Sequence, residues 1–119
     1  MIITVNKSFR YSLKPIELYD ITRGIWKIGP EARSNAEYAF AVYGGIVQEV
    51  YKINSWHPAG TTFTTKQDIM DGYKEKNRWE FVGNIAEDTV RKKYINANVS
   101  STRVKHHASP IIYINIFDN

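Results

Sequence analysis

A pair of glycines between two strand-forming runs is the feature that most constrains how this chain can fold. Residues 37–56 read EYAFAVYGGIVQEVYKINSW, with Gly44 and Gly45 near the middle. Two adjacent glycines can adopt the positive φ angles that a tight hairpin turn requires. In the first run, two small alanines alternate with larger apolar residues, so both faces of that strand can be buried. A hairpin cannot bury its apolar face alone, so we expect the remaining chain to pack over it.

Local signals predict further elements on both sides of this hairpin. The expected strands are 2–5, 78–86 and 110–117, the expected helices are 15–26 and 87–95, a helical turn is expected at 31–36, and 61–65 is prone to form a strand. Pro15 suits the first position of a helix, and Gly83 indicates a bulge in its strand. The apolar run at 110–117 is typical of a central strand covered on both faces. Residues 66–77 are polar and are expected to form an exposed loop.

Short strands with helices at their junctions predict the fold class. We expect an α+β domain, with a small curled, mostly antiparallel sheet or pseudo-barrel and two or three short helices. The 119 residues are enough for one domain with a single core. The absence of cysteine excludes disulfides and thiolate metal sites. With no apolar run of 18 residues and no signal-peptide pattern at its start, the chain is expected to be cytoplasmic and to make no membrane contact.

The net charge of +4 is unevenly distributed along the sequence. Residues 7–33 hold six basic and three acidic groups, and residues 87–107 hold five basic and two acidic groups. A fold that brought these two segments together would present a basic face, which favours a polyanionic partner. The alternative is an ordinary solvated surface.

Recognisable catalytic and metal-binding motifs are absent. The chain has no Walker A loop, no G-x-G-x-x-G and no H-E-x-x-H sequence. His106 and His107 are adjacent, and neighbouring side chains on an extended chain point to opposite sides, so we expect no metal site and no cofactor. No spacing pairs His57 or His106 with a carboxylate for acid–base chemistry, so an enzyme is less expected than a binding domain.

Three tryptophans stand near the ends of expected elements, each with a basic neighbour. Trp26 lies beside Arg23 and Lys27, Trp56 precedes a histidine, and Trp79 follows Arg78. Such residues can be ordinary core or rim packing. They can also stack on nucleic-acid bases while the cations hold phosphate. The T-R-G-I-W sequence at 22–26 is the best local candidate for a ligand contact.

Four segments together carry a family resemblance. They are YDITRGIWK at 19–27, AEYAFAVYGGIVQEVYKINSW at 36–56, RWEFVG at 78–83 and PIIYIN at 110–115. They resemble small bacterial and phage domains of the PUA-like type, which includes ASCH, EVE and YTH domains, and are closest to a module that accompanies a class of GIY-YIG nucleases. The resemblance implies a pseudo-barrel whose cleft binds nucleic acid or a modified base, without catalysis. It places Arg23 and Trp26 at the cleft mouth, with Tyr43, Trp56 and Trp79 as walls. The chain lacks the GIY-YIG nuclease portion.

The function expected from the sequence is therefore binding of DNA, RNA or a nucleotide. The candidate contact residues are Arg23, Trp26, Lys27, Tyr43, Trp56, Arg78, Trp79, Arg103 and Lys105. Two alternatives are a small nuclease or nucleotide-processing enzyme, and a phage or mobile-element protein that binds a host protein or a signalling nucleotide.

Overall fold

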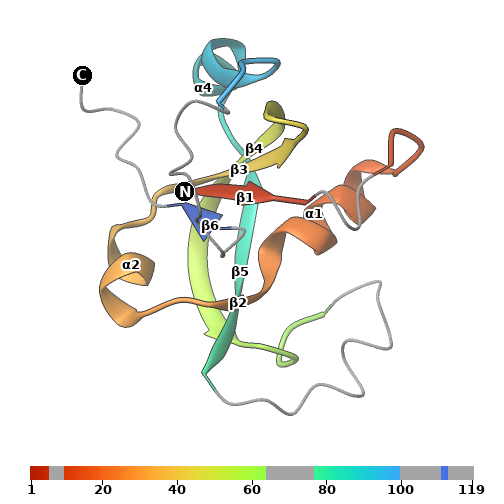
Figure 1. Ribbon diagram of the computed structural model, residues 1–119. Helices are drawn as coiled ribbons and strands as arrows, with labels where there is room; N and C mark the ends of the chain where they lie inside the picture. Colours follow the sequence, from red (N-terminus) through yellow and green to blue (C-terminus); the bar gives the residue numbers. More distant parts are fainter. Residues whose placement is uncertain (6–9, 64–76, 100–110, 113–119) are drawn as a thin grey trace.

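A curled six-stranded sheet with three helices packed on it forms the described part of the protein (Figure 1). The computed structural model describes residues 1–5, 10–63, 77–99 and 111–112. The strands are β1 (Ile2–Thr4), β2 (Gly24–Lys27), β3 (Tyr38–Tyr43), β4 (Ile46–Pro58), β5 (Arg78–Ile85) and β6 (Ile111–Ile112), and the helices are α1 (Pro15–Arg23), α2 (Pro30–Asn35) and α4 (Asp88–Tyr94). The strand order is β2-β5-β4-β3-β1-β6, and of these pairs only β1 and β3 are parallel. The predicted fold class is confirmed.

The predicted hairpin is present as strands β3 and β4. Gly44 and Gly45 have φ angles of 58° and 81°, the left-handed values that a type I′ turn needs and that glycine adopts without steric cost. The strands pair directly from Tyr43 and Ile46 at the turn. β4 continues to Pro58 because its second half pairs with β5.

The sheet is buried on both faces, with a separate core on each. One core contains Met1, Ile3, Val5, Ile21, Ile28, Ala39, Ala41, Tyr51 and Phe81, and the other contains Ile2, Tyr38, Phe40, Val42, Val47, Val50, Ala86 and Val90. Side chains of a strand alternate between faces, so β3 contributes its alanines to the first core and its large residues to the second. We call these sides the α1 face, which α1 and α2 cover, and the α4 face, on which α4 packs. Figure 1 shows α4 at the top, away from the other two helices.

The first helix is shorter than predicted. It begins at Pro15 as expected but ends at Arg23, and residues 24–27 form β2 instead of the last helical turn. Trp26 therefore lies in a strand, opposite Trp79 of β5. Ile21 and Ile25 are four residues apart, which suits a helix, but pairing with β5 outweighs a helix propensity already weakened by Gly24.

The prediction of a central last strand is wrong for the described part of the chain. There β6 comprises only Ile111–Ile112 and pairs antiparallel with β1 at one end of the strand order. The strand buried on both faces is β3, all of whose residues but the last are buried. The helical turn at 31–36 and the helix at 87–95 are confirmed as α2 and α4. Residues 61–63 of the strand-prone stretch 61–65 form no strand. Residues 64–65 and the predicted exposed loop at 66–77, except for Asn77, lie outside the described residues.

Strands β4 and β5 approach too closely at Gly83 for a side chain to fit. A Cβ atom on Gly83 would lie 2.1 Å from the carbonyl oxygen of Lys52. The irregularity predicted here falls on the partner strand, where the register shifts between Ile53 and Ser55. The Gly83 amide also donates a hydrogen bond to the Tyr19 hydroxyl (3.0 Å), which ties β5 to α1.

Candidate functional site

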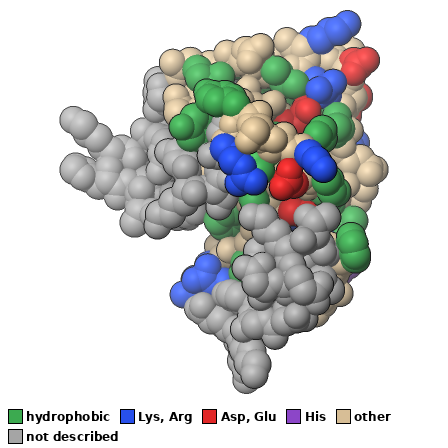
Figure 2. Space-filling model, turned by 90° about the vertical axis from the view of Figure 1, so that its right-hand side faces the viewer, with side chains coloured by type: hydrophobic (Ala, Val, Ile, Leu, Met, Phe, Trp, Pro, Cys, Tyr) green, Lys and Arg blue, Asp and Glu red, His purple; other side chains and the backbone are tan. Residues whose placement is uncertain are grey.

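The described parts of the two basic segments do not meet in one face. Their helices, α1 and α4, pack on opposite faces of the sheet, and residues 7–9 and 100–107 of these segments lie outside the described residues. Figure 2 shows the side of the molecule on which α1 lies. There Lys and Arg side chains are interspersed with Asp and Glu. A candidate site must therefore be sought in local geometry.

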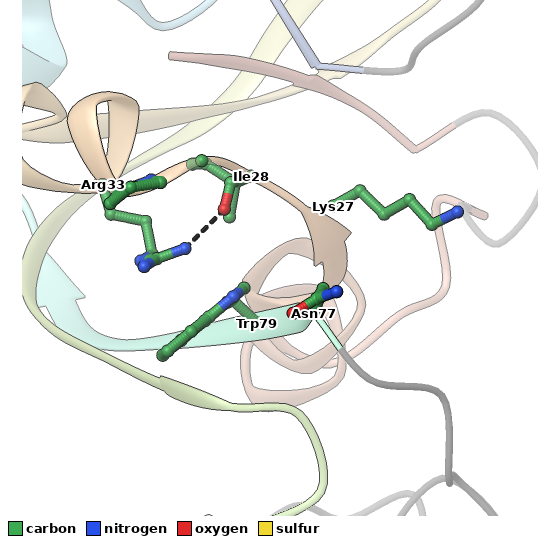
Figure 3. A pocket seen from close by; sticks show the side chains of 7 residues that line it. Lys27, Ile28, Arg33, Asn77 and Trp79 are labelled. Atoms are coloured by element: carbon green, nitrogen blue, oxygen red, sulfur yellow. Dashed lines mark hydrogen bonds between the residues drawn. The ribbon is translucent and has the colours of Figure 1, made fainter.

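A pocket of about 670 Å³ lies where the turn between β2 and α2 faces the start of β5 (Figure 3). Its lining residues are Lys27, Ile28, Gly29, Pro30, Arg33, Asn77 and Trp79. This volume is within the range of small-molecule sites in proteins. Two of the described residues that line it are cations, and none is a carboxylate. The pocket therefore favours an anionic ligand.

The most defined feature of the pocket is a guanidinium packed on an indole. The Cζ atom of Arg33 lies 3.7 Å from the Trp79 ring centroid, and Nη1 of Arg33 donates a hydrogen bond of 2.5 Å to the Ile28 carbonyl. Figure 3 shows Arg33 directly above Trp79, with this hydrogen bond on the pocket side. A cation over an indole face is attracted by the ring quadrupole, so the ring and the carbonyl together hold the guanidinium in place.

Local structure explains why Arg33 reaches this position. Pro30 opens α2, and the Arg33 amide donates to the Gly29 carbonyl (3.0 Å), which sets the first helical turn. Ala32 and Ala36, four residues apart, pack on the α1-face core. Arg33 follows Ala32 on the helix, so its side chain starts at the edge of the α1-face core. From there it extends to Trp79 of β5. Ile28, 5% exposed, anchors the preceding turn.

Lys27 and Asn77 complete the polar part of the lining. Lys27 is exposed at the end of β2 and pairs in register with Arg78. Figure 3 shows its side chain extending away from the Arg33–Trp79 pair, while Asn77 lies beside the indole. Asn77 has φ of 68°, a left-handed value that asparagine tolerates better than most residues. The pocket thus has a fixed cation at one end and a long, exposed one at the other.

Arg23, expected at a cleft mouth, lies instead in the protein interior. It is 4% exposed. Its Nε and Nη1 atoms donate to the carbonyls of Phe81 (2.9 Å) and Phe63 (3.0 Å). Its Nη2 donates to the Thr62 hydroxyl and lies 3.6 Å from the Glu80 carboxylate. All three guanidinium nitrogens are thus occupied by the protein itself.

Glu80 completes this buried cluster. Its carboxylate accepts hydrogen bonds from the Gly60 amide (2.6 Å) and the Thr62 amide (3.0 Å) and from the Thr62 hydroxyl. Asp20 contributes a second carboxylate 4.0 Å from Arg23. The cluster joins α1, β5 and residues 60–63, which is a structural role.

The three indoles all border the α1-face core. Trp26, Trp56 and Trp79 are each partly buried against it. The Trp26 indole donates to the Thr22 carbonyl (2.8 Å), and Trp56 packs edge-on against Phe81 with ring centroids 5.6 Å apart. The Trp56 N–H is buried without an acceptor among the described residues. Trp79 is thus the one of the three that lines the pocket described above.

The other predicted contact residues are dispersed. Tyr43 lies at the hairpin turn and does not line the pocket. Its ring forms a T-shaped pair with the ring of Tyr11, with centroids 5.7 Å apart. Arg78 is partly buried beside Lys27 but is not among the lining residues. Arg103 and Lys105 lie outside the described residues. Of the seven predicted residues that the structure describes, it brings two, Lys27 and Trp79, together in this pocket.

Arg33 and Asn77 were not predicted as site residues. From the sequence, Arg33 is only part of a basic segment, and Asn77 is the end of a polar loop. The one available signal was the Gly29-Pro30 pair after a basic, aromatic stretch, because such a pair marks a turn. Nothing in the sequence pairs Arg33 with an indole 46 positions further on.

The enzyme alternative requires a histidine paired with a carboxylate, and the described residues do not show this pairing at His57. His57 lies opposite Glu80 in the sheet, but the Glu80 carboxylate is bonded to Gly60 and Thr62. The His57 ring instead shares a hydrogen bond of 2.8 Å with the Ser55 hydroxyl. No group of three His, Asp or Glu side chains that could hold a metal ion occurs in the described ranges.

Comparisons with protein-family models, with curated proteins and with solved structures find no match for this chain. Among the residues that the structure describes, no helix is long and apolar enough to cross a membrane.

Proposed function

We propose that this protein is a small nucleic-acid-binding domain that holds a phosphate of DNA or RNA in the pocket between β2, α2 and β5. The observation that carries the proposal is the Arg33 guanidinium, fixed on the Trp79 ring at 3.7 Å in a pocket whose described lining contains a second cation and no carboxylate. Arginine is favoured for phosphate recognition because its planar fork matches two phosphate oxygens.

Lys27 supports binding of a chain rather than of an isolated anion. It lines the same pocket, and its side chain extends away from Arg33 (Figure 3), so the two cations offer separate contacts to the phosphates of one strand. The sequence pI of about 9.3 adds a general attraction to polyanions.

The direct test is a fluorescence anisotropy titration with labelled single-stranded and double-stranded DNA and RNA. At about 50 mM salt we expect binding, and at about 200 mM salt we expect weaker binding, since each phosphate contact releases counterions. Replacing Arg33 or Lys27 by Ala should weaken binding by about tenfold or less for each contact removed. Failure of all four nucleic acids to bind at the lower salt concentration would reject the proposal.

Lys92→Ala is the matched control. Lys92 is exposed on α4, which covers the opposite face of the sheet from α2. This substitution removes the same charge from the whole molecule but leaves the pocket intact. Equal loss of affinity in Lys92→Ala and Lys27→Ala would show that net charge, rather than this pocket, determines binding.

A further inference from the structure

The Trp79 indole supports Arg33 and leaves that face of its ring closed to a base. The Cζ atom lies 3.7 Å from the ring centroid, and each guanidinium nitrogen lies ~1.3 Å from Cζ, as in other conjugated C–N bonds. A guanidinium with one nitrogen pointing straight at the ring would bring that nitrogen to ~2.4 Å from it, well inside van der Waals contact. Whatever its tilt, the cation lies at contact distance over the ring centre, where it occupies the place of a stacked base.

The same geometry leaves some N–H groups of Arg33 available to bind a ligand. A guanidinium has five N–H groups, and among the described residues the Arg33 side chain makes one hydrogen bond, from Nη1 to the Ile28 carbonyl. The donors on Nε and Nη2 lie along one edge of the plane and form the fork that binds two oxygens of one phosphate. The group best matched by this cation is therefore a phosphate in its plane.

The other two indoles offer no replacement for a stacking wall in this pocket. Trp26 donates its N–H to Thr22 and Trp56 meets the edge of Phe81, and neither lines the pocket. The interpretation of the tryptophans as walls of a base-binding cleft thus gives way to packing for Trp26 and Trp56 and to support of a cation for Trp79.

We infer that this pocket is a phosphodiester-backbone site, in which Trp79 positions Arg33 and no base is stacked or read. The inference rests on the proposed function and specifies its chemistry. Binding at this pocket then depends on the number and spacing of phosphates and is indifferent to the presence or identity of the bases.

An abasic oligonucleotide tests the inference without any change to the protein. We compare a labelled single strand with a strand of the same length that keeps every phosphate and lacks every base, both at the lower salt concentration. A backbone site predicts dissociation constants that differ by less than about fivefold, whereas a single stacked base contributes roughly fivefold to more than 100-fold. A difference of fivefold or more overturns the inference while leaving nucleic-acid binding established. If neither strand binds, the inference fails, and the titrations with double-stranded DNA and RNA decide separately whether the proposed function stands.

Substitutions at Arg33 give a second, independent readout. Arg33→Ala should weaken both strands by the same factor and reduce the slope of log K against log salt by about 0.7 for a single strand. Arg33→Lys keeps the charge but loses the two-donor fork, so its affinity should lie between those of Arg33→Ala and the unsubstituted protein. If Arg33→Ala instead binds the normal strand at least as tightly as the unsubstituted protein, the exposed indole stacks a base and the inference is wrong.

Substitutions at Trp79 test its positioning role. Trp79→Phe keeps a ring face beneath Arg33 and should retain most of the affinity, whereas Trp79→Leu removes the ring and should lower affinity toward that of Arg33→Ala. Thermal melting by circular dichroism shows for each variant whether it is folded. Equal affinity of folded Trp79→Leu and unsubstituted protein would exclude a role for the indole in positioning Arg33.

Discussion

At the scale of single residues, two arginines of similar sequence setting have opposite roles. Arg23 and Arg33 both belong to the basic segment 7–33, yet Arg23 is enclosed by backbone carbonyls and Glu80, and Arg33 lines a pocket. Removing one member of a buried ion pair leaves the other charge without compensation, which typically costs several kcal/mol. The two residues therefore differ in what their loss should change.

We predict that Arg23→Met lowers the free energy of unfolding by about 3 kcal/mol and that the folded fraction binds nucleic acid normally. Urea denaturation followed by tryptophan fluorescence measures the stability. The control is Arg10→Met, because the Arg10 side chain is 66% exposed and pairs with Glu17 only at 3.9 Å, so its loss should cost less than about 1 kcal/mol. An Arg23→Met protein with unchanged stability but lost binding would make Arg23 a ligand contact after all.

A second residue-scale prediction concerns pH. The Tyr38 hydroxyl donates a hydrogen bond to Glu87; this bond, with a lesser contribution from burial, raises the pKa of Tyr38 to about 12, and it lowers the pKa of Glu87 below its usual 4.5. A lowered carboxyl pKa contributes stability above pH 4.5 that is lost as pH falls through the folded-state value. The raised phenol pKa contributes stability below pH 10 that is lost as pH rises toward 12.

Tyr38→Phe removes both contributions at once. The difference in unfolding free energy between the unsubstituted protein and Tyr38→Phe should be constant between about pH 6 and pH 9 and shrink on further acidification below about pH 4.5. Urea titrations across this range measure it. A difference that grows on acidification would contradict the assigned hydrogen bond.

At the scale of elements, the interior glycine of β5 controls how closely β4 and β5 pair. We predict that Gly83→Ala destabilises the protein by about 2 kcal/mol, because its Cβ would meet the Lys52 carbonyl and force the strands apart. Gly29→Ala is the matched control, since a Cβ there meets nothing within 4 Å and its φ of −73° suits any residue. Thermal denaturation compares the two, and equal melting temperatures would contradict the close approach.

Elements with strong local signals were predictable from the sequence. The Gly44-Gly45 turn, the Pro15 helix start and helix α4 are each determined within a few residues, and each is confirmed. In α4 the local signal is an acidic first turn (Asp88) and a basic last turn (Arg91, Lys92 and Lys93). β2 was not predictable because its strand state comes from pairing with β5, more than fifty residues away. The position of β6 at the end of the described sheet was not predictable either. An apolar run indicates that a strand is buried, but it does not indicate which strand it pairs with.

At the scale of the whole molecule, the crossover from β1 to β3 creates the pocket. Between these parallel neighbours the chain forms α1, then β2 at the far end of the sheet, then α2. The return from β2 through Gly29 and Pro30 brings Arg33 over β5. Two of the pocket residues, Lys27 and Trp79, could be proposed from the sequence, because basic and aromatic residues near element ends are common binding candidates. Their convergence with Arg33 depends on the path of the chain, which no local pattern encodes.

The most direct test of the account is an NMR titration that follows the arginine Nε–H signals while a single-stranded oligonucleotide is added. We predict that the Arg33 signal, assigned by its absence in Arg33→Lys, shifts on binding. The signals of Arg23 and Arg91 should stay in place, because their Nε–H groups are bonded to the Phe81 carbonyl and the Glu49 carboxylate (2.9 and 2.8 Å). Binding that moves the Arg23 signal, or that leaves the Arg33 signal unchanged, would contradict a phosphate site on the Trp79-supported guanidinium.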